Sequence, residues 1–309
     1  GNAYKEIGLY ELALDSYLHA ININPEFFDA IYNKGLVLQK MGRHDEARAT
    51  LERLVQLSPN HIPGKWALSL CQLVLGDFEN GLKNYESRFT NPELSHSFIK
   101  RNLPGLEWSG DQSIQNKTIF IYCEQGLGDT IQFSRYCSLL SKLGAKVILE
   151  VQKPLQNILS TLSGVDQLIT TGDQVPNHDF YCSLLSLPLA LRTNLTNIPS
   201  QPRYISSNEE FLNKWKNSLG SGHKLRIGLI WSGNQHHKND ANRSIPLSLF
   251  SQLISEQHTF FSLQKEVRPT DLENLRALHE ITHLGDGLTD FCDTAAVCDL
   301  MDLVITVDT

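Results

Sequence analysis

The chain has 309 residues, which is long enough for two or three domains with hydrophobic cores of their own. Its composition is 41% hydrophobic and 20% charged, as in ordinary globular proteins, and its net charge of −7 argues against a basic nucleic-acid-binding surface. No apolar run reaches membrane-spanning length, and the six cysteines show no metal-ligand spacing. Cys71, Cys123 and Cys137 fall inside apolar patterns, so we expect them to be buried thiols in a reducing compartment and the protein to be cytoplasmic.

The first part of the chain repeats with a period of 34 residues, since Pro25 and Pro59 are 59 − 25 = 34 positions apart. Three further sets of positions agree in this register: glycines between helices, small residues where helices approach, and large apolar residues that fill the groove. These are Gly8, Gly42 and Gly76; Ala13, Ala47 and Gly81; and Tyr17, Leu51 and Tyr85. The period is that of tetratricopeptide repeats (TPRs), stacked helix pairs with a concave face for protein or peptide partners. We therefore expect TPRs over residues 1–91, with the first repeat cut at its start, in preference to an unrelated helical bundle.

After a polar linker at 92–117, the hydrophobic pattern alternates between strands and helices. Strands are expected at 118–123, 146–151, 167–170 and 179–181, with helices at 130–143 and 154–162. A polar helix at 208–219 and a glycine-containing break at 220–222 precede a second block. Its strands are expected at 225–231, 259–264, 281–284 and 303–307, with helices starting near Pro246, Thr270 and Thr289. The alternation predicts parallel sheets in two α/β domains, 118–220 and 221–309, that face a cleft.

The strand expected at 118–123 runs into the turn Glu-Gln-Gly-Leu-Gly-Asp-Thr, which opens a helix. In this layout backbone N–H groups face a ligand, often a phosphorylated one, so Gly126 and Gly128 are candidate donor-binding residues. Asp129 has two interpretations. As a helix cap it would contribute about 1 kcal/mol. As a general base it would be held ionised by the helix N-terminus and aimed at a ligand.

A dinucleotide site is a third interpretation of this turn. Gly126 and Gly128 match the first two fingerprint glycines, and Glu150 follows after 150 − 128 = 22 residues, where a ribose-binding acid is expected. The third fingerprint position is Ile131, which is too bulky for the close packing that glycine or alanine permits there. This interpretation also requires Glu150 to point into the crevice of the turn.

A second polar segment, 231–246, follows the strand expected at 225–231 and opens the helix after Pro246. Lys238 and Arg243, with Ser244, suit a diphosphate, because they combine a point charge with a bidentate guanidinium. A solvated polar loop is the alternative. The neighbouring His236 and His237 diverge, so no metal site is expected. The chain closes on an apolar strand followed by Asp308 and Thr309, where a turn and a helix should follow.

These motifs, in this order, resemble those of bacterial TPR proteins with a glycosyltransferase domain related to the heptosyltransferases (glycosyltransferase family 9-like). The motifs are Glu-Gln-Gly-Leu-Gly-Asp-Thr-Ile-Gln-Phe, Ile-Trp-Ser-Gly-Asn, Lys-Asn-Asp, Asn-Arg-Ser-Ile-Pro and Val-Asp-Thr, and the resemblance covers essentially the whole chain. It implies TPR helices followed by a GT-B fold of two Rossmann-like halves, the second incomplete. It also implies transfer from a nucleotide-sugar without a cofactor or required metal.

The resemblance further implies residue roles. Asp129 is the base that deprotonates the acceptor hydroxyl, Arg243 contacts the donor phosphates, and Asp308 and Thr309 open the donor-binding turn. The helix after this turn is absent from the sequence, so we expect a fragment, truncated at both ends and inactive by itself. The leading expectation for the parent protein is an inverting glycosyltransferase whose repeats recruit the acceptor. The alternative is a TPR scaffold with a non-catalytic transferase-like domain.

Overall fold

The computed structural model describes residues 1–96, 98–236 and 239–308, and the chain divides into two compact units. Unit 1 consists of Gly1–Glu150, Gly164–Ile169 and Asp173–Gln201. Unit 2 consists of Val151–Ser163, Thr170–Gly172 and Pro202–Thr309. In the described part of the chain, no helix is both long and apolar enough to cross a membrane. The division predicted from the sequence, into repeats (1–91), a linker (92–117) and two α/β domains (118–220 and 221–309), stays a prediction.

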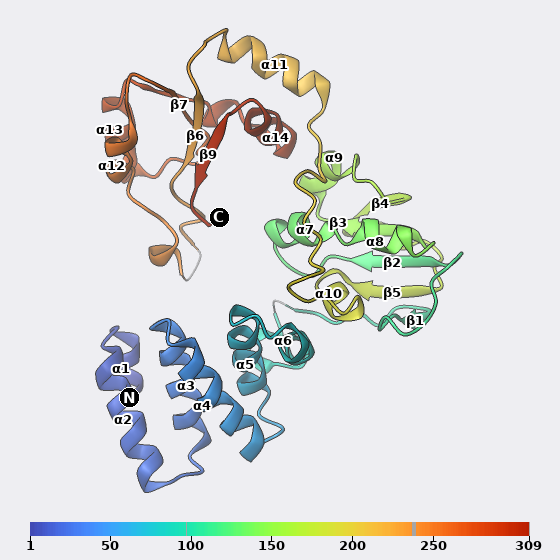
Figure 1. Ribbon diagram of the computed structural model, residues 1–309, viewed down its shortest axis with the longest axis vertical. Helices are drawn as coiled ribbons and strands as arrows, with labels where there is room; N and C mark the ends of the chain where they lie inside the picture. The colour runs from blue at the N-terminus through green and yellow to red at the C-terminus, as the bar shows by residue number, and fades with distance from the viewer. Residues whose placement is uncertain (97, 237–238, 309) are drawn as a thin grey trace. The chain divides into compact units, whose positions relative to one another are not determined.

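Unit 1 begins with helices that pair in chain order, blue to teal in Figure 1: α1 (Asn2–Glu6), α2 (Tyr10–Ile23), α3 (Phe28–Lys40), α4 (His44–Leu57), α5 (Ile62–Val74) and α6 (Phe78–Tyr85). The glycines that were predicted to turn the chain within each pair, Gly8, Gly42 and Gly76, have φ angles of 79°, 73° and 82°. Only glycine adopts this conformation at little cost. Ala47, Leu51 and Leu54 are fully buried in the core that the helix pairs share. The predicted helical repeats are confirmed.

The 3₁₀ helices η1 (Glu86–Phe89) and η2 (Pro92–Leu94) lead from α6 to a parallel sheet. Its strands are β1 (Leu106–Glu107), β2 (Thr118–Tyr122), β3 (Lys146–Val151), β4 (Gln167–Thr170) and β5 (Phe180–Ser183), in the order β1-β5-β2-β3-β4. The helices of this region are α7 (Leu127–Ser134), α8 (Cys137–Lys142), η3 (Lys153–Leu155), α9 (Gln156–Leu159), η4 (Leu184–Ser186) and α10 (Leu187–Ala190), of which η3 and α9 belong to unit 2. Residues 119–122 of β2 are all buried, as expected for a parallel sheet that is covered on both faces.

Two features of this region differ from the expected elements. The segment 92–117 contains β1, which pairs with β5, and Trp108 just after β1 is buried with its indole N–H bonded to the carbonyl of Gln112 at 3.0 Å. The helix expected at 130–143 begins earlier and is interrupted between α7 and α8. There the Ser134 hydroxyl donates to the carbonyl of Ile131 at 2.8 Å, and such side-chain bonds compete with the helical backbone pattern.

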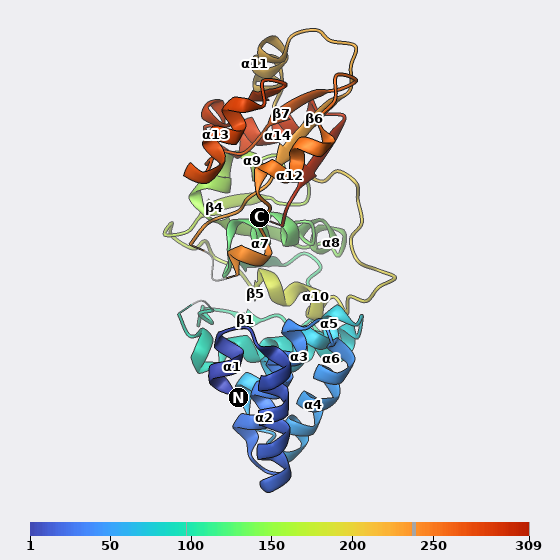
Figure 2. The ribbon, with the colours of Figure 1, turned by 90° about the vertical axis from the view of Figure 1, so that its left-hand side faces the viewer.

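Unit 2 contains a second parallel sheet, with strands β6 (Arg226–Ile230), β7 (Thr259–Ser262), β8 (Ile281–His283) and β9 (Leu303–Thr306) in the order β8-β7-β6-β9. Figure 2 labels its two central strands, β6 and β7. Its helices are α11 (Glu209–Leu219), η5 (Asp240–Asn242), α12 (Leu247–Phe250), η6 (Ser251–Leu253), α13 (Pro269–Ala277), η7 (Gly285–Gly287) and α14 (Phe291–Asp299). One apolar cluster gathers around Trp231 and another around Trp215. Helical repeats followed by α/β structure with parallel sheets are therefore confirmed.

The buried carboxylate of Asp293 ties α11 to α14. It accepts hydrogen bonds from Lys214 Nζ at 2.6 Å, from the indole of Trp215 at 2.8 Å and from the backbone N–H of Thr289 at 3.0 Å. Burial raises the pKa of Asp293, but these hydrogen bonds outweigh it and hold the pKa well below its usual range. A carboxyl whose pKa is lowered by folding stabilises the fold above its unfolded pKa, about 3.9, and this contribution is lost as the pH falls further.

We therefore expect Asp293→Asn to lower the free energy of unfolding at neutral pH, and the deficit to shrink as the pH falls below about 4. Urea unfolding followed by tryptophan fluorescence at pH 6 and pH 3 measures both values. A deficit that is equal at the two pH values would contradict the assigned role of the ionised carboxylate.

Candidate functional site

The glycine turn lies at the carboxyl end of β2 and opens α7. Gly126 is the N-cap residue of α7, with φ −65° and ψ 170°, and Asp129 stands half-buried in the first helical turn. A Cβ placed on Gly126 would lie 3.4 Å from Asp129 Oδ2, whereas a Cβ on Gly128 would meet nothing within 4 Å. Asp129 therefore does not occupy the N-cap position, and its carboxylate lies close to the backbone of the turn. The catalytic role of Asp129 and the donor role of the glycines stay predictions.

Glu124, between β2 and the glycine turn, is held by residues that the sequence analysis did not single out. Its carboxylate accepts from the Ser183 hydroxyl and, at 2.8 Å, from Arg88 Nη2. Arg88 belongs to η1 at the end of the repeats, and its side chain is completely buried. One sequence signal pointed to it. In the 34-residue register, Arg88 follows Ala20 and Leu54 (54 − 20 = 34, 88 − 54 = 34), so an arginine stands where the earlier repeats have apolar residues.

The acid that the dinucleotide interpretation needs is already engaged. Glu150 is 2% exposed, and its Oε1 accepts from Arg101 Nη1 at 2.6 Å. The Arg101 guanidinium also lies 5.3 Å from the centre of the Tyr122 ring. A carboxylate bound this way is a poor ribose ligand, and the structure therefore argues against the dinucleotide interpretation.

In unit 2, two of the predicted donor-binding residues come together. Arg243 Nε donates to Asp308 Oδ2 at 3.1 Å. Arg243 follows β6 and Asp308 follows β9, two neighbouring parallel strands, so the pair stands at the carboxyl edge of their sheet. Asp308 is 86% exposed, which makes it a weak partner that an anionic ligand can displace. Lys238 and Thr309 lie outside the described residues.

Ser244 belongs to a polar network beside this pair. Its hydroxyl donates to Asp240 Oδ1 at 2.7 Å and accepts from Arg268 Nη2 at 2.9 Å. Arg268 also reaches Asp240 at 2.6 Å and the carbonyl of Gly233 at 3.1 Å, so it holds the loop after β6 in place. Ser244 and Arg268 line a cavity of about 270 Å³, with Pro246 and Asp271 on its wall. Arg268 was not among the predicted site residues, although one sequence signal marked it: a cation shortly after a strand and directly before Pro269.

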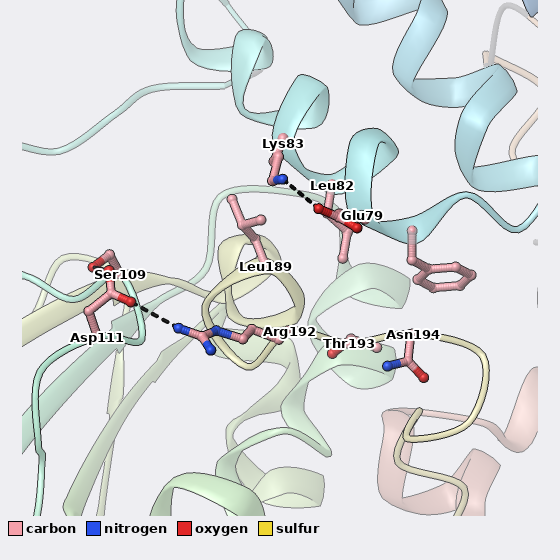
Figure 3. Close-up of a pocket in the computed structure, with 10 residues that line it drawn as sticks. Glu79, Leu82, Lys83, Ser109, Asp111, Leu189, Arg192, Thr193 and Asn194 are labelled. Atoms are coloured by element: carbon pink, nitrogen blue, oxygen red, sulfur yellow. Dashed lines mark hydrogen bonds and ion pairs between the residues drawn. The ribbon is translucent and has the colours of Figure 1, made fainter.

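A larger cavity, of about 550 Å³, lies in unit 1 beside α6 (Figure 3). Leu82 of α6 and Leu189 of α10 form apolar walls, as the close-up shows. The charged groups on its rim neutralise each other, since Lys83 pairs with Glu79 at 2.9 Å and Arg192 with Asp111 at 3.2 Å. All four charges are thus paired locally, and the cavity presents no unpaired charge to a ligand.

The helical repeats belong to a known class. Residues 1–42 match the family model described as TPR repeat, and residues 28–61 match the model described as Tetratricopeptide repeat. The N-terminal part of the chain therefore consists of TPRs.

Two curated proteins are similar to this chain, one over nearly its whole length and one over a quarter of it. Protein FlbA of Caulobacter vibrioides is 24% identical over 319 residues, which cover 93% of this chain and 52% of FlbA. Superkiller complex protein 3 of Mus musculus is 30% identical over 76 residues, which cover 25% of this chain and 5% of that protein. The chain thus spans about half the length of FlbA.

Among solved structures, the first TPR of Spaghetti (RPAP3) bound to an HSP90 peptide is 20% identical, with a TM-score of 0.29, and the match covers 31% of this chain and 79% of that one. The MamA RS-1 ArsTM double mutant is 26% identical, with a TM-score of 0.28, and the match covers 29% of this chain and 51% of that one.

Proposed function

We propose that this protein is an inverting glycosyltransferase of the GT-B type, which takes its sugar from a nucleotide-sugar and whose TPRs recruit a protein or peptide acceptor. One observation carries the proposal. In both units the polar residues that the sequence singles out, Asp129 in one and Arg243 with Asp308 in the other, follow the carboxyl ends of parallel strands. Ligands of α/β folds bind at this edge of a sheet.

The proposed reaction assigns a proton to Asp129 and a diphosphate to Arg243. The acceptor hydroxyl oxygen forms a bond to the anomeric carbon of the donor sugar while its proton passes to the Asp129 carboxylate. The bond from that carbon to the diphosphate oxygen breaks, and the nucleoside diphosphate leaves with the electron pair. Attack from the face opposite the leaving group inverts the anomeric carbon.

The donor side of the proposal rests on cationic and hydroxyl groups. The Arg243 guanidinium can exchange the exposed Asp308 carboxylate for two phosphate oxygens, a pairing that suits its planar geometry. The proposed donor contacts also include Ser244, Lys238, Thr309, Gly126 and Gly128. We expect no cofactor or metal to be needed, because cationic side chains can neutralise the leaving diphosphate.

Calorimetric titration of the full-length protein with a panel of nucleoside diphosphates and their sugars tests the proposal. Binding of one panel member in the micromolar range would identify the nucleotide and support a donor site. No binding across the panel would refute the transferase proposal.

The second candidate function is a TPR scaffold whose α/β part is a non-catalytic binding module. The observation that favours it is that family models match residues 1–61, within the repeats. Stacked TPRs leave a concave face on which a peptide can dock without any chemistry. Specific binding of a protein partner by a protein that binds no nucleotide would favour this candidate.

A further inference from the structure

The last turn of the repeats makes a buried ionic contact with the first sheet. Arg88, in η1, extends its guanidinium to the carboxyl edge of this sheet, where Glu124 follows β2 and Ser183 ends β5. These two strands are neighbours, since Tyr122 pairs with Ser183. Arg88 is 36 positions from Glu124 and 95 positions from Ser183 in the sequence. The contact is therefore a tertiary link between the helical repeats and the parallel sheet.

The guanidinium of Arg88 has every nitrogen engaged. Nε and Nη2 donate to Glu124 Oε1 at 3.0 and 2.8 Å, and Nη1 donates to Glu86 Oε1 at 2.5 Å. Nη2 also reaches the Ser186 hydroxyl at 2.7 Å. The central carbon of the guanidinium, Cζ, lies over the Phe89 ring, 4.0 Å from the ring centre. A point charge such as lysine cannot reproduce this fork.

The charges in this cluster depend on one another. Burial lowers the pKa of Arg88, but the carboxylates of Glu124 and Glu86 outweigh burial and raise it. Removing one partner of such a pair leaves the other charge buried without compensation, which is strongly destabilising. Burial raises the pKa of Glu124, and the charge of Arg88 is the largest influence that opposes it. Without Arg88, the hydroxyl of Ser183 is the described hydrogen-bond donor that remains for the Glu124 carboxyl.

The same cluster lies close to the glycine turn. Burial is the main reason that the pKa of Tyr85, at the end of α6, rises to about 12, and the charge of Asp129 is among the further causes. Arg88 also donates to Ser186 of η4, which packs against α7, so the cluster lies beside the segment that runs from Glu124 to Asp129. The cavity beside α6 is lined by residues of both parts, and each of the two exposed ion pairs on its rim lies within one part, so neither pair links the repeats to the sheet.

We infer that Arg88 is a positioning residue, which fixes Glu124 and through it the turn that carries Asp129, so that the end of the TPR array is part of the candidate site. The link to catalysis rests on the proposed function, whereas the control of the turn by Arg88 does not. A partner that binds the repeats would then be connected to the glycine turn through Arg88 and Glu124.

Hydrogen exchange of the full-length protein, measured by mass spectrometry on peptides from 126–134, tests the control of the turn without any substrate. We expect Arg88→Met to speed exchange there by at least about tenfold, because opening the turn no longer breaks the ion pair. Arg88→Lys should give a smaller increase. The matched control is Leu54→Ala, which empties the same register position one repeat earlier, in the buried core of the repeats.

In the single variants, two outcomes would overturn the inference: unchanged exchange at 126–134 in Arg88→Met, or an equal increase in Leu54→Ala, which would reflect general destabilisation. A double variant, Arg88→Met with Glu124→Leu, tests whether the ion pair positions the turn or only attaches the repeats to the sheet. Replacing a buried ion pair by apolar residues often restores stability, so this variant can regain the attachment without the ion pair. We expect its melting temperature to recover while exchange at 126–134 stays fast and transfer stays slow. Recovery of all three would mean that the pair only attaches the repeats. Fast exchange in a protein without transferase activity would refute the proposed function and support the positioning role.

Discussion

Asp129→Asn is expected to reduce sugar transfer by the full-length protein about 10²–10⁴-fold in kcat, the usual contribution of a general base. The amide has nearly the shape of the carboxylate but cannot accept the hydroxyl proton. Donor affinity should be nearly unchanged, because Asp129 contacts the acceptor in the proposed reaction and not the diphosphate. Initial rates with the nucleotide-sugar identified by calorimetry measure the first effect, and titration with the corresponding nucleoside diphosphate measures the second.

The control for this variant is Asp15→Asn, which makes the same chemical change at an exposed position on α2. It should leave kcat unchanged. Undiminished turnover in Asp129→Asn would remove Asp129 from the mechanism. A loss of activity that accompanies a lower melting temperature would instead point to a structural role in the first turn of α7.

Arg243→Ala should weaken binding of the nucleoside diphosphate about 10- to 100-fold, since a hydrogen bond to a charged group contributes about 1.5–3 kcal/mol. The turnover of enzyme saturated with donor should change less. Calorimetric titration at two salt concentrations sharpens the test. The wild-type affinity should fall as salt rises, because salt screens the attraction between Arg243 and the phosphates, and the variant should show a weaker dependence.

Arg203→Ala is the matched control for the loss of charge. Arg203 also lies in unit 2 and also pairs with an aspartate, Asp299, at 2.8 Å, while its side chain is 68% exposed. Its removal should leave the affinity within error of the wild type. Equal losses in the two variants would show that only the net charge of the unit matters, and an unchanged affinity in Arg243→Ala would refute the assigned phosphate contact.

The parts of the fold that depend on local sequence could be predicted closely. The 34-residue period fixes the repeats because each helix pair needs the same turn, and Gly42 has the left-handed backbone that this turn requires. The expected strands at 146–151 and 167–170 coincide with β3 and β4, and the strand expected at 225–231 contains β6. Buried parallel strands are continuous apolar runs, so short stretches of sequence reveal them.

What the sequence did not reveal depends on contacts between distant residues. The strand β1 has two exposed residues, Leu106 and Glu107, and only its pairing with β5 makes it a strand. The buried state of Arg88 depends on Glu124 and Ser183, which no local pattern connects to it. In the candidate site, the glycine turn follows from the strand before it, whereas the pairing of Arg243 with Asp308 follows from the order of strands in the sheet.

Arg88, directly after the last helix pair, gives the repeat array a fixed end. If the third pair were replaced by a copy of the second, a leucine equivalent to Leu54 would face Glu124. The loss of the cationic partner of a buried carboxylate typically costs about 3–5 kcal/mol. The pairs that precede it carry apolar residues at this position and pack on one another through a shared core. We therefore expect the N-terminal side of the array to tolerate added repeats better than the pair next to the sheet tolerates exchange.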